Sequence, residues 1–339
     1  MIKFITRLTA LLAGVVLHVP SGFAQASVAT DPVGYVTVTV EANSDAVVSA
    51  VMSRPSVFTG TIASVDDADT VTLSDSPGFS TDEFAPTDLS GNNSYYVKLT
   101  SGDREGLWAI ISGNTTSSLD LTFVTQNLGS VENDKVQAGD TVEIIPCWTP
   151  ATLFPEANIS NLSELLVFSR TVAGINLSAS ATYVCYDGFG WYNGGTLVDN
   201  LPIYPDESLI FRNKSVSPQQ LTQAGVVPMA AFRTVLALVD DGIMQDIRLT
   251  SGLPVNVTLQ ELADLGADGD GDQILIFDNT LAGENKSASI TATYYNGFGW
   301  YNGGTPMNSY VLTPGEGIVY RKQGANTSEV VLDIKPTYQ

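Results

Sequence analysis

The sequence lacks the residues that most catalytic and metal sites need. It contains one histidine, His18, among 339 residues, and His18 lies in an N-terminal segment that we predict is removed on export. The mature chain would then have no imidazole, which excludes Ser-His-Asp and Cys-His catalysis and the usual zinc sites. We therefore expect a non-catalytic protein. A carboxylate-dependent glycoside hydrolase is the weaker alternative, because that chemistry needs no histidine.

Basic residues are also scarce. The chain has 15 Lys and Arg against 36 Asp and Glu, which gives a net charge of −21. Loss of residues 1–26 would remove two cations, Lys3 and Arg7, and no acid, so 13 cations against 36 acids would leave −23. Nucleic acids and anionic membranes are bound through clustered Lys and Arg. The composition therefore argues against both as partners, and the acidic surface fits a role in solubility or a source of cation sites.

Long hydrophobic runs are missing beyond the N-terminus. Lys3 and Arg7 precede an apolar stretch, residues 8–19, and Ala-Gln-Ala at 24–26 is a small-x-small cleavage sequence, as in secretory signal peptides. No later stretch reaches about 18 apolar residues, the length of a membrane-spanning helix. We predict a signal peptide over residues 1–26 and no membrane insertion. The exported product would be periplasmic, at the cell surface or secreted.

What the chain does contain is an internal repeat. The nine residues Gly-Phe-Gly-Trp-Tyr-Asn-Gly-Gly-Thr occur at 188–196 and again, unchanged, at 297–305. At this offset of 109 residues, 23 of 49 positions are identical between Glu164–Arg212 and Gln273–Arg321. Identity over such a length does not arise by chance. It indicates that one structural unit was duplicated.

Cysteine is limited to Cys147 and Cys185. In an exported chain a disulfide between them could persist, and it would close a loop of roughly 40 residues. Free thiols are the alternative, and the sequence leaves both open. Tyr294 stands in the second copy where Cys185 stands in the first, so the repeated unit does not require a thiol at that position.

Most of the remaining sequence is typical of short antiparallel strands. Residues 35–40 alternate with period two, and similar segments follow, separated by Asn, Asp, Gly and Ser clusters. Helix signals are few: residues 258–265 carry leucines spaced by three, and residues 217–225 have Pro near the start and Gly at the end. We predict a mostly β fold, with a duplicated antiparallel β-unit, an inserted small β-barrel-like domain and few short helices.

An insertion explains how the repeated motifs are spaced. Before the second repeat block, Gln245-Asp246 and Thr258-Leu259 lie close together, whereas the matching Ser44-Asp45 and Thr152-Leu153 are far apart. The first copy is therefore predicted to be discontinuous, and three domains in series are the alternative. The predicted division is a signal peptide at 1–26, copy 1 at 27–57 plus 148–228, a barrel-like insert at 58–147 and copy 2 at 229–339.

An ordered series of short motifs runs through the mature chain. It comprises Asp31–Tyr35, Ser44-Asp45, Arg54-Pro55, Ser101–Gly106, Gly139–Pro146 and the two Gly-x-Trp-Tyr blocks. In this order the chain resembles an uncharacterised family of exported bacterial β-rich proteins with a duplicated Gly-x-Trp-Tyr unit. The resemblance implies export and a shared β-rich fold, and it implies no residue roles.

The repeated aromatic pairs are the first candidate ligand site, namely Trp191 with Tyr192 and Trp300 with Tyr301. Exposed aromatic faces can stack on sugar rings, and packing inside a hairpin is the alternative. Successive strand residues point to opposite faces, so a Trp and the Tyr that follows it cannot both be buried or both be exposed. The sequence thus predicts one exposed ring per copy, with a glycan or an envelope protein as its partner.

A glycine-rich loop carries alternate aspartates, Asp268, Asp270 and Asp272. Such a loop can direct three carboxylates at one calcium ion. However, Gln273 and Asn279 stand where an EF-hand has glycine and glutamate, and copy 1 has no aspartate triplet. A calcium site and a solvated acidic turn therefore both remain open, and no other cofactor is indicated.

Two Glu/Arg pairs, Glu207 with Arg212 and Glu316 with Arg321, recur in both copies. We interpret each as a turn carboxylate and a strand-end cation at the surface, where a pair contributes only ~0–1 kcal/mol. Taken together, the sequence favours an exported non-catalytic β-protein with a structural, adhesive or surface-associated role. A carbohydrate-binding protein that uses the paired Trp-Tyr hairpins is the alternative.

Overall fold

The computed structural model describes residues 31–74, 76–88, 91–123, 135–236, 242–262, 265, 269–323 and 330–338. The chain divides into two compact parts, Met1–Asp31 and Pro32–Gln339, and the described residues belong almost entirely to the second. The predicted signal peptide lies outside them. Antiparallel sheets, a closed barrel and two short α-helices make up the described chain, which confirms the predicted fold class. None of the described helices has the length and apolar character needed to cross a bilayer.

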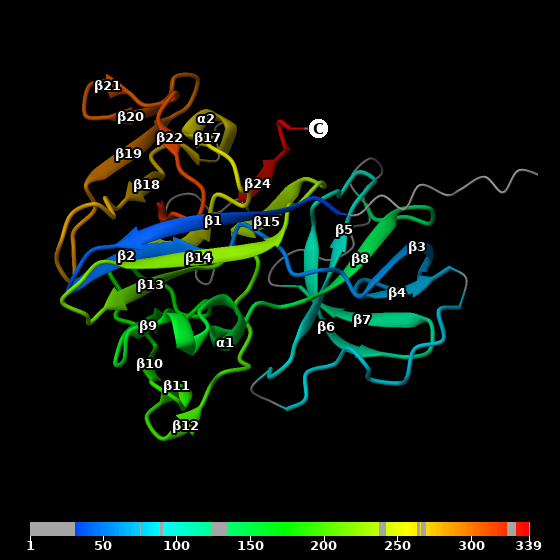
Figure 1. Ribbon diagram of the computed structural model, residues 1–339. Coiled ribbons are helices and arrows are strands. Elements are labelled where there is room, and N and C mark those ends of the chain that lie inside the picture. The colour runs from blue at the N-terminus through cyan, green and yellow to red at the C-terminus, as the bar shows by residue number, and fades with distance from the viewer. Residues whose placement is uncertain are drawn as a thin grey trace, which may run out of the picture. The chain divides into compact units, whose positions relative to one another are not determined.

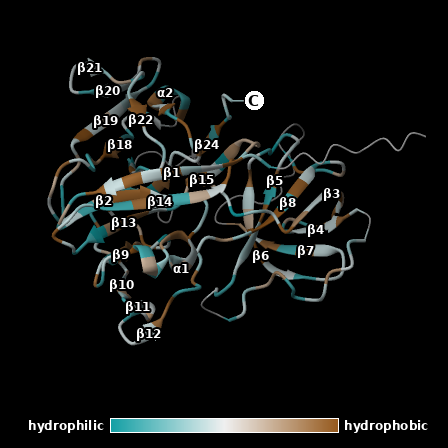
Figure 2. Ribbon diagram, viewed as in Figure 1, coloured by the Kyte–Doolittle hydropathy of each residue, from teal (hydrophilic) through white to brown (hydrophobic). Residues whose placement is uncertain are grey.

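Six strands form the barrel, which Figure 1 shows in blue through cyan to green. They are β3 (Phe58–Val65), β4 (Thr70–Leu73), β5 (Tyr95–Leu99), β6 (Trp108–Asn114), β7 (Ser118–Thr122) and β8 (Thr141–Pro146). The sheet closes in the order β3-β4-β7-β6-β5-β8. Alternate strand residues face opposite sides, so Leu119 and Leu121 of β7 are buried inside while Asp120 stays exposed. The same alternation makes hydrophobic and hydrophilic colours mix along the strands of Figure 2.

Copy 1 is built on a six-stranded sheet of order β12-β11-β10-β9-β13-β2. Its edge strand β2 comes from before the barrel in sequence, and the other five come from after it. The strands are β2 (Ser44–Ser49), β9 (Glu164–Val167), β10 (Ala181–Tyr186), β11 (Gly190–Asn193), β12 (Thr196–Leu197) and β13 (Ser208–Asn213). A separate antiparallel pair, β1 (Val33–Val40) with β14 (Gln219–Val226), flanks this sheet in sequence and runs side by side in Figure 1. Helix α1 (Pro150–Leu153) and the 3₁₀ turn η1 (Glu156–Asn158) precede β9.

Copy 2 repeats this order strand for strand as β21-β20-β19-β18-β23-β16. The strands are β16 (Gln245–Thr250), β18 (Gln273–Ile276), β19 (Ile290–Tyr295), β20 (Gly299–Asn302), β21 (Thr305–Pro306) and β23 (Gly317–Lys322). The pair β15 (Phe232–Leu236) with β24 (Val330–Ile334) corresponds to β1 with β14. Helix α2 (Leu259–Leu262) corresponds to α1, and a short pair, β17 (Val257–Thr258) with β22 (Val311–Leu312), corresponds to a single bridge between Trp148 and Ile203.

Strand register locates the extra residues of copy 1. Ser44 of β2 lies opposite Asn213 of β13, and Gln245 of β16 lies opposite Lys322 of β23. The first members of these pairs are 201 residues apart and the second members 109, so copy 1 holds 92 more residues between its edge strand and β13. The barrel strands fall in this stretch. The domain boundaries given above stay a proposal.

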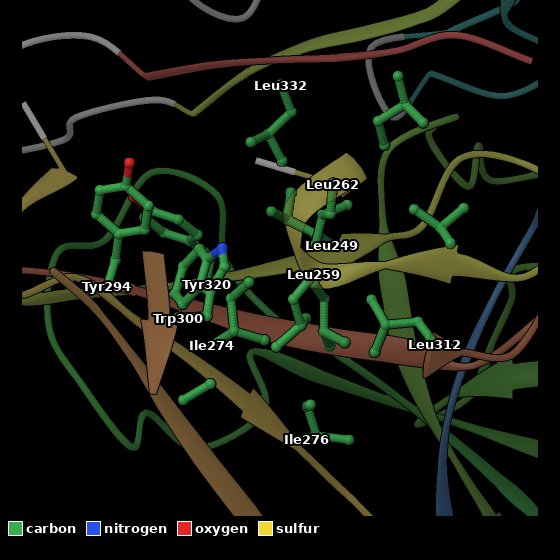
Figure 3. Packing of buried hydrophobic residues seen from close by; sticks show 14 of the residues in the cluster. Leu249, Leu259, Leu262, Ile274, Ile276, Tyr294, Trp300, Leu312, Tyr320 and Leu332 are labelled. Carbon is green, nitrogen blue, oxygen red and sulfur yellow. The ribbon is translucent and has the colours of Figure 1, made fainter. Parts of the chain in front are cut away.

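Each copy packs its own core around a buried tryptophan. In copy 2, Trp300 lies against Tyr294 and Tyr320, and Ile274 and Leu259 continue the cluster, as Figure 3 shows. In copy 1, Trp191 packs with Cys185, Phe211 and Leu165. These four residues of copy 1 occupy the positions of Trp300, Tyr294, Tyr320 and Ile274 in copy 2. Equivalent positions therefore build both interiors, although their side chains differ except at the tryptophan.

The copies also contact each other reciprocally. The edge strand of each copy receives a loop of the other, and the contacts recur with the roles exchanged. They form two equivalent pairs: Asp45 N to Gly283 O (3.0 Å) with Asp246 N to Gly174 O (2.9 Å), and Arg212 Nη2 to Asn285 Oδ1 (2.9 Å) with Arg321 Nη2 to Asn176 Oδ1 (2.9 Å). This reciprocity is the mark of an isologous interface, here formed between two segments of one chain.

One of the two predicted helices is present in the structure and the other is not. Residues 258–265 do contain α2, whereas the predicted helix at 217–225 is wrong, because this segment forms β14. Gln219, Leu221 and Gln223 are buried on one side of β14 and the residues between them are exposed. The period of two, set by pairing with β1, overrides the Pro and Gly signals that mark helix ends.

Candidate functional site

The two tryptophans of the repeat are enclosed. Trp191 and Trp300 are both 0% exposed, and the Trp191 indole Nε1 donates a hydrogen bond to the Phe154 carbonyl oxygen (2.9 Å). Trp191 lies opposite Cys185 in the β10–β11 pair, so its ring points to the interior of copy 1. The interpretation of these tryptophans as ligand contacts is therefore wrong, and the packing alternative holds for them.

The tyrosines that follow them lie on the outer face, as strand alternation requires. Tyr192 is half-buried beneath Tyr186, with ring centroids 5.8 Å apart and planes at 74°. Tyr301 meets Tyr295 in the same edge-on geometry, at 5.9 Å and 71°. Tyr186 and Tyr295 are 41% and 46% exposed, so the outer face of each hairpin offers a pair of rings.

The most exposed aromatic side chain of each hairpin is one that the sequence analysis did not single out. Phe189 is 72% exposed and Phe298 71%, and each occupies the turn that joins the two strands. The turn is fixed, because Phe189 N donates to the Tyr186 carbonyl (2.9 Å), as Phe298 N does to that of Tyr295 (2.9 Å). The signal available in the sequence was a phenylalanine kept in a glycine-flanked turn of both copies.

We call these two sets the aromatic faces. The first aromatic face consists of Tyr186, Phe189 and Tyr192, and the second of Tyr295, Phe298 and Tyr301. Polar residues border them. Asp187, Asn193 and Asn302 are exposed at the ends of the hairpins, where they can exchange hydrogen bonds with a hydroxylated ligand.

The glycines of the hairpin account for its shape. Gly188 and Gly190 have φ of +77° and +94°, and Gly297 and Gly299 have +77° and +87°. Such left-handed conformations strain every residue with a Cβ. A Cβ at Gly190 would also lie 2.5 Å from the Asp199 carboxylate, which accepts a hydrogen bond from Trp191 N (2.7 Å).

The two described aspartates of the loop, Asp270 and Asp272, have separate hydrogen-bond partners. Asp268 lies outside the described residues. The Asp270 Oδ1 accepts a hydrogen bond from Asn296 N (2.8 Å), which braces the second hairpin. Asp272 is 0% exposed and accepts hydrogen bonds from the Tyr320 hydroxyl and from Gln323 N (2.7 Å).

This arrangement turns Asp272 into the core and away from a loop cation, and the calcium site, which also needs Asp268, stays a prediction. Asp272 lies inside copy 2 because Tyr320, the counterpart of Phe211, brings a hydroxyl into the core that needs an acceptor. Lys322 of the same strand places its Nζ 3.9 Å from the Asp272 carboxylate. Across the described part of the chain, no three His, Cys, Asp or Glu residues are grouped as metal ligands.

Cys147 and Cys185 are both buried free thiols, so the disulfide alternative is wrong. They belong to different clusters, since Cys147 packs with Tyr96, Trp108 and Ile145 and Cys185 packs around Trp191. Burial raises the pKa of Cys147 to about 12 and that of Cys185 to about 11. Both thiols are therefore protonated at neutral pH and unreactive.

The recurring Glu/Arg pairs do not pair with each other. Arg212 binds Asp45 through Nε (2.7 Å) and Nη2 (3.0 Å), and Arg321 binds Asp246 in the same way at 2.7 and 2.9 Å. In each case the partner lies on the adjacent edge strand. Hydrogen bonding to these carboxylates raises the pKa of both guanidinium groups. The surface-pair interpretation is thus wrong, because each arginine links strands at the contact between the copies.

Glu207, which we interpreted as a surface carboxylate, is buried. It is 7% exposed, and burial raises its pKa to about 7. Beside it, Arg170 binds Asp206 through two hydrogen bonds of 2.7 and 2.8 Å. The Asp206 carboxylate also accepts a hydrogen bond from the Thr234 hydroxyl (2.7 Å).

A cavity of about 50 Å³ adjoins these groups at the contact between the copies. We call it the interface cavity. It is lined by residues 168–170, 172 and 206–208 of copy 1 and by residues 245–248 of copy 2, with Leu177 and Val235. The sequence analysis looked for residues shared by the two copies and so did not find this cavity. Its charged residues Arg170, Asp206 and Arg248 are replaced by unlike residues at the matching positions of the other copy, and this difference was the available signal.

Comparisons with known proteins add no assignment. A scan with family models, a search of curated proteins and a search of solved structures each found no match to this chain.

Proposed function

We propose that the protein is an exported, non-catalytic binding protein that attaches to polysaccharide through its two aromatic faces. It would act in the periplasm, at the cell surface or in the surrounding medium. The observation that carries the proposal is the exposure of Phe189 and Phe298, which are 72% and 71% accessible in otherwise matching hairpins.

The identical nine-residue block supports this reading by elimination. Three of its four glycines have positive φ in each copy, its tryptophan fills the core and its tyrosine packs on the tyrosine of the preceding strand. These roles account for their retention through folding alone. Phe189 and Phe298 gain little from folding because their rings remain in water, so contact with a ligand is the better reason for an apolar ring there.

A polysaccharide fits the chemistry of these faces. Aromatic rings present flat apolar surfaces that suit the C–H faces of sugar rings, and the bordering Asp and Asn side chains suit hydroxyl groups. The strongly acidic chain disfavours polyanionic ligands. Two faces on one chain would also bind a repeating polymer with avidity greater than that of either face alone.

The test is co-sedimentation of the mature protein with insoluble cellulose, chitin, xylan and peptidoglycan. We expect one of these to deplete the protein from solution, with F189A and F298A each binding several-fold more weakly and the double variant showing no retention. Melting should stay unchanged, since exposed side chains contribute within about 0.5 kcal/mol. The matched control is V216A, which removes an apolar side chain that is 85% exposed and lies outside both faces.

Two results would count against the proposal: no retention on any polysaccharide, or equal retention of the double variant and V216A. Release of reducing sugar from a bound polymer would instead support the hydrolase alternative.

A structural or adhesive role through protein contact is the second candidate. Leu197 is 49% exposed and lies opposite Tyr192 in the β11–β12 pair, which extends the first aromatic face with an aliphatic residue of the kind found in protein interfaces. Cross-linking of the mature protein in intact cells would then join it to envelope proteins, and F189A/F298A would remove that product.

A further inference from the structure

The interface cavity occupies one of two positions that the duplication makes equivalent. At the other position, Asn279 stands where Arg170 stands and Val47 stands where Arg248 stands. There the Asn279 amide bonds both backbone groups of Val47, at 3.0 Å to its N–H and 3.1 Å to its carbonyl oxygen. At that position a side chain is bonded to the backbone of the other copy, whereas its counterpart holds the interface cavity.

Arg248 is the cation in the cavity that lacks a paired anion. Its guanidinium carbon lies 3.4 Å from the centroid of the Phe168 ring. Its Nη1 is buried and has no hydrogen-bond partner among the described residues. A buried N–H without an acceptor costs about 1–3 kcal/mol, so the cavity has an unmet need for an acceptor.

The nearby acids do not supply that acceptor. Asp206 is held by Arg170, and Asp246 is held by Arg321 through both carboxylate oxygens. Glu207 has its pKa raised to about 7 by burial, so it is largely uncharged in mildly acidic solution. In mildly acidic solution the charge of Arg248 is therefore not balanced by an acid that lines the cavity.

We propose that the interface cavity binds a small carboxylate of about four to six non-hydrogen atoms, with its carboxylate on Arg248 and its apolar end against Leu177 and Val235. Stacking on Phe168 leaves the edge of the guanidinium free for a planar, two-oxygen acceptor. A volume of about 50 Å³ corresponds to about four water-sized spheres, so an acid much larger than butyrate would not fit.

The test uses propionate as the probe on the full mature chain at pH 6. Heat of binding is measured by calorimetry and the melting temperature by circular dichroism, with formate, butyrate and benzoate as a size series and propionamide as the uncharged analogue. We expect millimolar binding of propionate that weakens at least tenfold for benzoate and vanishes for propionamide. R248Q should lose it.

K214Q is the matched control, because Lys214 is a cation paired with Glu284 outside the cavity and its loss changes the net charge equally. It should bind propionate as the unmodified chain does. If R248Q melts cooperatively and still binds, or if K214Q loses binding to the same degree, the proposal is overturned. Should R248Q not fold, V235F tests the same idea by filling the cavity, and retained propionate affinity there would contradict it.

Discussion

Glu207 shows how burial governs the behaviour of a single side chain. It sits in the turn before β13 with its carboxylate directed inside, where the Tyr204 N–H is 3.3 Å from Oε2 and Arg170 and Asp206 are close enough to affect its pKa. Sequence placed Glu207 in a turn correctly. It could not show that a contact with another copy covers that turn, since such a contact depends on residues far away in the chain.

The first prediction concerns the pH dependence of stability. An unfolded glutamate titrates near 4.3, and burial raises the folded pKa of Glu207 to about 7. Between these values the folded chain keeps a proton that the unfolded chain has released, so the free energy of unfolding falls as pH rises. Urea unfolding at pH 4.5, 6 and 8 should show that E207Q loses about 2–4 kcal/mol less than the unmodified chain. Parallel curves for the two proteins would refute this.

A second residue-scale prediction tests the contact between the copies. A Cβ on Gly317 would lie 2.4 Å from the Ser208 Cβ and 2.8 Å from Val47 Cγ1. G317A should therefore lower the free energy of unfolding by about 1–3 kcal/mol, as overpacking does. G304A is the control, because a Cβ there meets nothing within 4 Å. Equal denaturant midpoints for the two variants would show that the copies are not packed tightly at Gly317.

At the scale of elements, hairpins were predicted more reliably than helices. The Trp-Tyr hairpins expected from the repeat block are β10–β11 and β19–β20, and Gly positions with positive φ leave their turns few alternatives. The candidate site followed only in part: alternation gave one outward ring per copy, but not which member of Trp-Tyr it was. β14 was missed since its partner β1 lies 185 residues away at Thr37 and Thr222, a pairing that no local window contains.

The hairpins yield a third prediction. Asp199 Oδ1 accepts a hydrogen bond from Trp191 N at 2.7 Å, and Asn308 Oδ1 does the same for Trp300 N at 2.7 Å. D199N should change the free energy of unfolding by less than about 0.5 kcal/mol, because copy 2 uses asparagine in this place. D199A should cost about 1–3 kcal/mol, since it leaves the Trp191 N–H without its acceptor. Chemical denaturation distinguishes the two, and similar losses for both would assign the role to charge.

On the scale of the whole molecule, charge and duplication act together. The net charge of −21 opposes compaction. Arg212 and Arg321 form ion pairs with Asp45 and Asp246 at the contact between the copies, which offsets part of this repulsion. The internal repeat and the spacing of its motifs were enough to predict a duplicated β-unit with an inserted barrel-like domain. The interface between the copies could not be predicted, because the repeat does not tell which surfaces of the two copies face each other.

The fourth prediction follows from this excess of acid. Raising NaCl from 20 to 200 mM should raise the melting temperature by a few degrees, because the Debye length shortens and repulsion between carboxylates is screened. Magnesium chloride at the same ionic strength should give an equal shift. A much larger shift with magnesium would mean that a site binds the divalent ion, and a fall in melting temperature with NaCl would contradict the argument.

The placement of the barrel also determines the order in which strands can pair during folding. Asp45 and Arg212 are joined across 167 residues of chain, whereas Asp246 and Arg321 are joined across 75. During synthesis, β2 cannot pair with β13 until the entire barrel and most of copy 1 have been made. Pairing between strands so far apart in sequence slows folding. During that time the apolar edge strand can pair with wrong partners, including its counterpart β16, and a barrel that folds early and quickly would shorten this exposure.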